Sequence, residues 1–255
     1  MTISSTLRAL LEMQARDNGF DRQLPSEGDW LVFASTKAPL KIWVTALGEG
    51  LPLVAFSQMN VAKALADHGT EIMSPVPAGA GAARMVKDVP TLHHLLRRAF
   101  QLALALPDEP LQVFKAKTAM LPRTTEVEKL VVQRIGQDIF RASLLEYFDG
   151  KCAVTGLAVP ELLRASHIKP WADCELDEER LDVFNGILLS PNLDALFDRG
   201  FITFEDDGRM RLSKVLPTSA VEALRIDASP TVMVGGLVAA RAMYLGYHRQ
   251  HVFRG

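Results

Sequence analysis

The run FNGILLSPNLDALFDRGFITF, residues 184–204, limits the fold of this chain more than any other stretch. GILLS is apolar but too short for a stable helix, so it predicts a strand. Ser190 followed by Pro191 is a typical helix start, and Gly200 is a typical helix end. The following FITFEDDGRMRLS predicts a hairpin that turns at Asp207-Gly208. The C-terminal part should therefore contain short strands around one short helix.

That helix would carry two carboxylates on one face. Asp194 and Asp198 are four residues apart, which brings their side chains together, while Leu193, Leu196 and Phe197 face a core. Two like charges at this spacing destabilise a helix unless a cation neutralises them. The pattern therefore indicates a metal site.

The segment RASHIKPW, residues 164–171, places a histidine in a short apolar stretch. LLRASHI predicts a strand, and KCAVTG at 151–156 predicts a second strand that pairs with it. An acidic loop follows at 173–182, which we interpret as a solvated face. An isolated histidine in a β-strand is usually a half-buried core residue. The carboxylates further along the chain nevertheless make His167 a candidate site residue.

Several motifs in this order resemble the HNH endonucleases, and most closely the bacterial restriction-type branch. They are CAVTG, ASHIKPW, NGILLSPNLDALFDRGF and the closing YLGYHRQHVF, and the resemblance covers roughly residues 140–255. It implies a β-hairpin and a helix around one divalent metal ion, and an enzyme that hydrolyses DNA phosphodiester bonds in restriction or defence.

The resemblance also assigns roles to individual residues. His167 matches the general base, and Asn185 matches the asparagine that braces the loop and the histidine strand. Asp194 and Asp198 match metal ligands, and their oxygens favour Mg²⁺ or Mn²⁺. The chain departs from the family twice, because Asp194 replaces the second histidine and Ser166 stands where many members have Asp, Glu or His. We therefore expect weak metal binding when no substrate is present.

Other polar residues near the motif have two interpretations. Arg164 shares a strand face with Ser166 and either contacts phosphate or pairs with the acidic loop. The same alternatives hold for Lys169. Trp171 and His248 are expected to pack in the core.

The first 120 residues predict an α+β domain of no recognised family, and residues 121–255 predict the nuclease domain with a helical lead-in and a C-terminal helix. The N-terminal pattern contains helices near 3–16, 58–69 and 91–106, with three strands between the first two. By analogy of architecture, this domain should recognise or target DNA. Arg97 and Arg98 are its best candidate DNA contacts. Its aromatic residues either hold a flipped base or form the core; they are Trp30, Phe33, Trp43 and Phe56.

Composition excludes several classes of protein. The net charge is -2, so any nucleic-acid binding must depend on local basic patches. Two cysteines cannot form a four-cysteine zinc site or a disulfide framework, so we expect no structural zinc and a cytoplasmic location. No signal peptide or membrane span is expected. Double-stranded DNA is the expected partner and a homodimer is a further expectation, while a degenerate binding scaffold and an RNA-directed nuclease remain open.

Overall fold

The computed structural model describes residues 4–48, 50–72, 76–106, 108–122, 124–226 and 238–255. The chain forms two compact units, Met1–Leu106 and Pro107–Gly255, each containing helices and strands. The α+β class expected from the sequence is confirmed. Within the described ranges, none of the helices is both long enough and apolar enough to cross a membrane.

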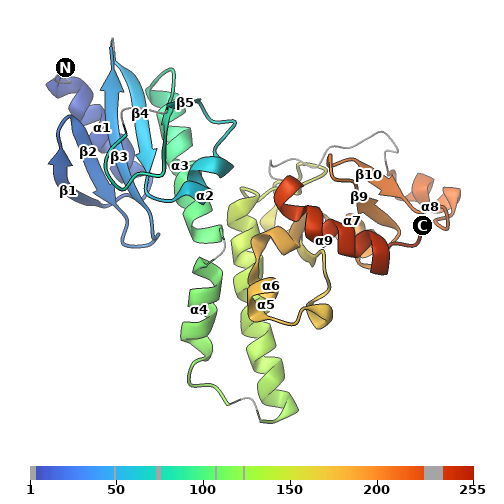
Figure 1. Ribbon diagram of the computed structural model, residues 1–255. Coiled ribbons are helices and arrows are strands. Elements are labelled where there is room, and N and C mark those ends of the chain that lie inside the picture. The colour runs from blue at the N-terminus through green and yellow to red at the C-terminus, as the bar shows by residue number, and fades with distance from the viewer. Residues whose placement is uncertain (1–3, 49, 73–75, 107, 123, 227–237) are drawn as a thin grey trace. The chain divides into compact units, whose positions relative to one another are not determined.

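The division between the units comes earlier than the expected boundary near residue 120. Helix α4 (Glu109–Thr118) packs against α5 (Glu126–Tyr147) and therefore belongs to the second unit. Phe114 and Thr118 of α4 are buried. The lead-in to the nuclease motif is consequently a helical hairpin, and Figure 1 shows its two helices side by side.

The first unit is a six-stranded antiparallel sheet with the order β1-β2-β3-β4-β6-β5. Three strands were not predicted, because their sequences are polar, short or rich in small residues. Those are β1 (Arg22–Glu27), β5 (Thr70–Ile72) and β6 (Ala82–Met85). The predicted elements correspond to α1 (Ser5–Asp17), β2 (Trp30–Ala34), β3 (Lys41–Leu47), β4 (Leu51–Phe56), α2 (Met59–Ala64) and α3 (Val89–Ala105).

Both faces of this sheet carry buried residues. Arg84 lies on the helix-facing side, where its buried guanidinium donates to the carbonyl of Ala62 in α2. The opposite face is an apolar cluster of Val32, Trp43, Leu53, Ala55 and Ala83. The sheet aromatics therefore behave as core residues, because Phe33, Trp43 and Phe56 are all buried.

The second unit is built around a two-stranded ribbon of β7 (Arg164–His167) and β8 (Gly186–Leu189). Helix α5 packs on one face of the ribbon, and α7 (Pro191–Asp198) packs on the other. The other elements of the described part are η1 (Pro160–Leu162), η2 (Trp171–Asp173), α6 (Asp177–Leu181), η3 (Val183–Asn185), β9 (Ile202–Phe204), β10 (Met210–Leu212), α8 (Thr218–Ala223) and α9 (Val238–His251).

The partner of the histidine strand differs from the expected one. The predicted partner, residues 151–156, folds into a turn, in which Gly156 donates its N–H to the carbonyl of Cys152. Only Ala153 of this segment bonds to the ribbon, through the carbonyl of Leu188. The hairpin of β9 and β10 is confirmed.

The long helix α5 begins with a capping box, which we expect to contribute to stability. The Thr125 hydroxyl accepts from the N–H of Glu128, and the Glu128 carboxylate accepts from the N–H of Thr125. Ser190 is the N-cap residue of α7, as the sequence predicts, but its side chain makes no capping hydrogen bond. We predict that Thr125→Ala lowers the free energy of unfolding by about 1 kcal/mol. Ser190→Ala is the matched control and should lower the free energy of unfolding by clearly less in urea denaturation. Equal losses in the two variants would contradict the capping role of Thr125.

Candidate active site

His167 is held in an aromatic setting on the α5 side of the ribbon. Its ring stacks on Phe140 at 3.7 Å between centroids, and Trp171 meets it edge-on at 5.4 Å. Its Nε2 lies 2.9 Å from the carbonyl oxygen of Arg180. A carbonyl only accepts hydrogen bonds, so Nε2 carries the proton and Nδ1 presents a lone pair.

Two glycines permit this close packing. A Cβ at Gly186, the residue paired with His167 across the ribbon, would lie 2.5 Å from the Phe140 ring. A Cβ at Gly136 of α5 would lie 2.5 Å from the Trp171 ring. The Asn-Gly pair and the mid-helix glycine are therefore explained by the approach of α5 to the histidine.

Burial controls the charge of His167. Desolvation lowers the pKa of its imidazole to about 4, although the hydrogen bond to the Arg180 carbonyl opposes this shift. The ring is therefore neutral at pH 7, which is the form that accepts a proton.

Asn185 joins the loop to the histidine strand and is completely buried. Its Oδ1 accepts from the N–H of Lys169 at 2.8 Å, and its Nδ2 donates to the carbonyl of Glu179 at 3.0 Å. Its backbone carbonyl accepts from Ile168. This arrangement matches the bracing that the sequence resemblance implies.

The carboxylates lie on the other face of the ribbon. Ser166, next to His167, points toward α7, and its hydroxyl donates to Oδ1 of Asp194. Asp198 is one helical turn further along α7. Strand alternation therefore separates the His167 ring from the carboxylates, which the sequence alone did not indicate.

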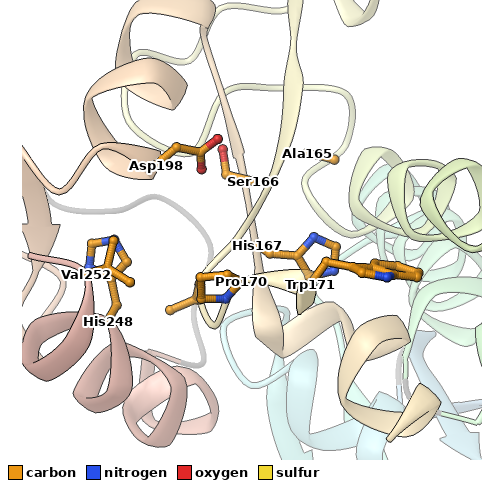
Figure 2. Close-up of a pocket in the computed structure, with 9 residues that line it drawn as sticks. Ala165, Ser166, His167, Pro170, Trp171, Asp198, His248 and Val252 are labelled. Atoms are coloured by element: carbon orange, nitrogen blue, oxygen red, sulfur yellow. The ribbon is translucent and has the colours of Figure 1, made fainter. Parts of the chain in front are cut away.

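One cavity nevertheless reaches both faces. It has a volume of about 350 Å³, and Ser166, His167, Trp171, Asp198 and His248 are among its lining residues. Figure 2 shows Ser166 and Asp198 turned toward one another, while the His167 ring points away from them and lies beside Trp171. The cavity is therefore bordered both by His167 and by the oxygen-bearing side chains of Ser166 and Asp198.

The electrostatics of the carboxylate pair suit a cation. Partial burial, followed by repulsion from Asp194, raises the pKa of Asp198 to about 6. The described residues include no group of three or more His, Cys, Asp or Glu arranged to hold a metal. Asp194 and Asp198 are the two carboxylates that could hold a metal, and their oxygen atoms suit Mg²⁺ or Mn²⁺ because these ions keep several water ligands.

The two candidate phosphate contacts have different surroundings. Arg164 is exposed and lies on the same face of β7 as Ser166. Lys169 is engaged by Glu179, with 2.9 Å between Nζ and Oε1, and this carboxylate raises the pKa of Lys169. Arg164 is therefore the more accessible of the two cations.

Helix α9 adds contacts that sequence reasoning missed. Arg241 is buried, and its guanidinium donates to the carbonyl oxygens of Gly186 at 3.1 Å and Val183 at 3.4 Å. Tyr244 donates to Asp182, which begins the turn containing Asn185. An arginine in a mainly apolar helix is the only sequence signal for this role.

His248 continues the same face of α9 and is buried, as expected. Its ring stacks on Phe197 at 3.9 Å, and its nitrogens lie 3.0 Å from Thr203 Oγ1 and 3.1 Å from the Phe197 carbonyl. It therefore attaches α9 to α7.

The N-terminal candidates Arg97 and Arg98 lie on α3 of the first unit. Arg97 is exposed, whereas Arg98 is half-buried and engaged by other residues. Arg97 is consequently the better placed of the two for an external ligand.

Several residues around this cavity lie in a stretch that matches a known protein family. Residues 152–205 match the HNH endonuclease family. The matched stretch contains the β7–β8 ribbon and α7, and it confirms the resemblance seen in the sequence and a nuclease-type domain in the C-terminal half. No curated protein matches the chain. Helices α5 and α9, which contact the site, lie outside the matched residues.

Two mid-helix glycines provide a test of the α5 packing. Alanine normally stabilises a helix relative to glycine by roughly 0.5–1 kcal/mol. At Gly136 its Cβ would overlap Trp171, so we predict that Gly136→Ala destabilises the protein by about 1–3 kcal/mol. Gly246→Ala in α9 is the matched control, because its nearest neighbour is 4.0 Å away. In chemical denaturation, the free energy of unfolding should decrease for Gly136→Ala and increase for Gly246→Ala. Stabilisation of both variants would contradict the packing described.

The buried histidines predict a pH dependence of stability. Burial lowers the pKa of His248 to about 4, below its ordinary value of 6.5. Between these values the unfolded chain binds a proton and the folded chain does not, so stability falls as pH decreases from 6.5 to 4. His248→Gln should reduce the slope of unfolding free energy against pH by up to about 1.4 kcal/mol per pH unit in this window. An unchanged slope in urea titrations would show that this residue does not titrate as described.

Proposed function

We propose that the protein is a divalent-metal-dependent HNH endonuclease that hydrolyses phosphodiester bonds of double-stranded DNA, in restriction or defence within the cytoplasm. The observation that supports this most directly is the oriented, neutral His167 in a cavity shared with Asp198 and Ser166. The family match over the same residues supports the reaction class.

In this proposal His167 is the general base. The Arg180 carbonyl holds the Nε2–H, so Nδ1 takes the proton from the attacking water. The Phe140 stack and the Trp171 edge restrict rotation of the ring. Asn185 keeps the loop carrying Arg180 attached to the strand carrying His167, through its bond to the nearby Glu179 carbonyl.

Asp194 and Asp198 would hold one Mg²⁺ or Mn²⁺, together with water and substrate phosphate. When bound, this ion polarises the scissile phosphate and stabilises the leaving oxygen. Ser166 donates to Asp194 and so orients one carboxylate of the pair. Cation binding would relieve the repulsion that raises the pKa of Asp198.

DNA contacts come from both units in this proposal. Arg164 reaches a phosphate from the Ser166 face of β7, while Lys169 chiefly secures the loop through Glu179. The first unit recognises DNA, with Arg97 and then Arg98 as the candidate contacts. Comparing cleavage of methylated and unmethylated supercoiled DNA distinguishes a restriction role from general cleavage, because a restriction role predicts a preference for one of the two.

The test is plasmid cleavage with Mg²⁺, Mn²⁺ or EDTA. We expect metal-dependent cutting that falls by about 10²–10⁴-fold in His167→Ala, because the water loses its base. Asp198→Asn should raise the metal concentration needed for half-maximal cutting, because one charged ligand is lost. His251→Ala, at an exposed histidine of α9, is the matched control and should retain activity.

Two results would contradict the proposal. Full cleavage by a pure His167→Ala protein would show that His167 is not the general base. Absence of cleavage with every metal, combined with metal-independent DNA binding, would favour a degenerate HNH scaffold, for which the serine at position 166 is the motivating departure. Preference for structured RNA would redirect the proposal to an RNA nuclease.

A further inference from the structure

Helix α5 is apolar on two sides, although only one side is covered. Val132, Gly136 and Ile139 face the interior of the second unit and are buried. On the opposite side of its N-terminal half, Val127 and Leu130 are 70% and 62% exposed. Val131 is 49% exposed, so these three aliphatic side chains form a stripe, which we call the α5 stripe.

The stripe is a concentration of apolar surface and not a set of isolated residues. Among the described residues, sixteen large apolar side chains are exposed, and four of them fall within residues 120–131. The fourth is Met120, which is 94% exposed just before the helix. Scattered exposed aliphatics are ordinary, but a contiguous group at one end of a helix indicates a binding surface.

Charge distribution indicates what covers the stripe. Glu126 and Arg134 lie four residues before and four residues after Leu130, on the exposed side of the helix. Glu126 is 85% exposed at its side chain and holds Lys129 at 2.7 Å, while no carboxylate in the described part of the chain pairs with Arg134. A two-fold axis at Leu130 would bring Glu126 of each copy next to Arg134 of the other. The surface is therefore complementary to itself.

We propose that the α5 stripe binds the α5 stripe of a second copy of this chain, with the two helices antiparallel and Leu130 at the two-fold axis. Such an interface is isologous, since the same patch serves both copies. Leu130 contacts its equivalent, Val127 and Val131 pack on either side, and two Glu126–Arg134 pairs close the ends. Charged pairs beside an apolar helix seam set the orientation of helices in this way.

The size of the patch suits reversible association. Stable interfaces bury about 800 Å² per partner, and three aliphatic residues with their charged neighbours provide a smaller core than that. A dimer that dissociates on dilution is therefore expected. The proposal does not depend on nuclease activity, because mass and cross-linking are measured without DNA.

Site-specific cross-linking tests the register. Both native cysteines, Cys152 and Cys174, are buried and free, so an introduced thiol reacts selectively. Leu130→Cys should form a disulfide-linked dimer under mild oxidation at least tenfold faster than Met243→Cys. Met243 is the matched control, because it is a 71% exposed residue of a different helix in the same unit.

Light scattering with charge reversal tests the orientation. The native chain should approach twice its 28.0 kDa mass at high concentration. Glu126→Arg and Arg134→Glu should each weaken association by several fold, and the double variant should restore it. A monomer at all concentrations, or equal cross-linking at Leu130→Cys and Met243→Cys, would overturn the proposal. A dimer unaffected by either charge reversal would overturn the antiparallel register.

Discussion

The stack of His167 on Phe140 is the contact on which the site depends. It requires α5 to approach the β7–β8 ribbon more closely than side chains normally permit, and Gly186 provides the necessary space on the ribbon. The same approach buries the imidazole, which keeps it neutral, and leaves Nε2 with a carbonyl as its partner. Ring orientation, protonation state and helix packing are therefore consequences of one contact.

Much of the second unit could be predicted from sequence because its signals are local. Ser190-Pro191 and Gly200 bound a short helix, and the four-residue spacing of Asp194 and Asp198 is a property of any helix. The pairing of β7 was predicted incorrectly, since it depends on a partner twenty residues away across an acidic loop. Periodicity identifies strands but does not select between two short apolar candidates of similar length.

The opposite orientations of Ser166 and His167 were also not predicted as a feature of the site. Adjacent strand residues must face opposite sides, so only one of them can point toward α7. Which one does so is decided by Gly186 and Phe140, whose close contact exists only in the folded unit. The sequence singled out His167 and the two carboxylates of α7, but their separation by the strand is a result of tertiary packing.

The residues that complete the site come from outside the family match. The matched stretch contains His167, Asn185 and the two carboxylates, yet His167 stacks on α5 and the turn at Asn185 is held by Arg241 of α9. The Arg241 guanidinium donates hydrogen bonds to the buried carbonyl oxygens of Gly186 and Val183. A buried polar group left without a partner costs about 1–3 kcal/mol of stability. The ribbon is short, and a two-stranded ribbon is only marginally stable alone. Helices α5 and α9 consequently belong to the structural unit of the site, because they hold the His167 ring and the Asn185 turn.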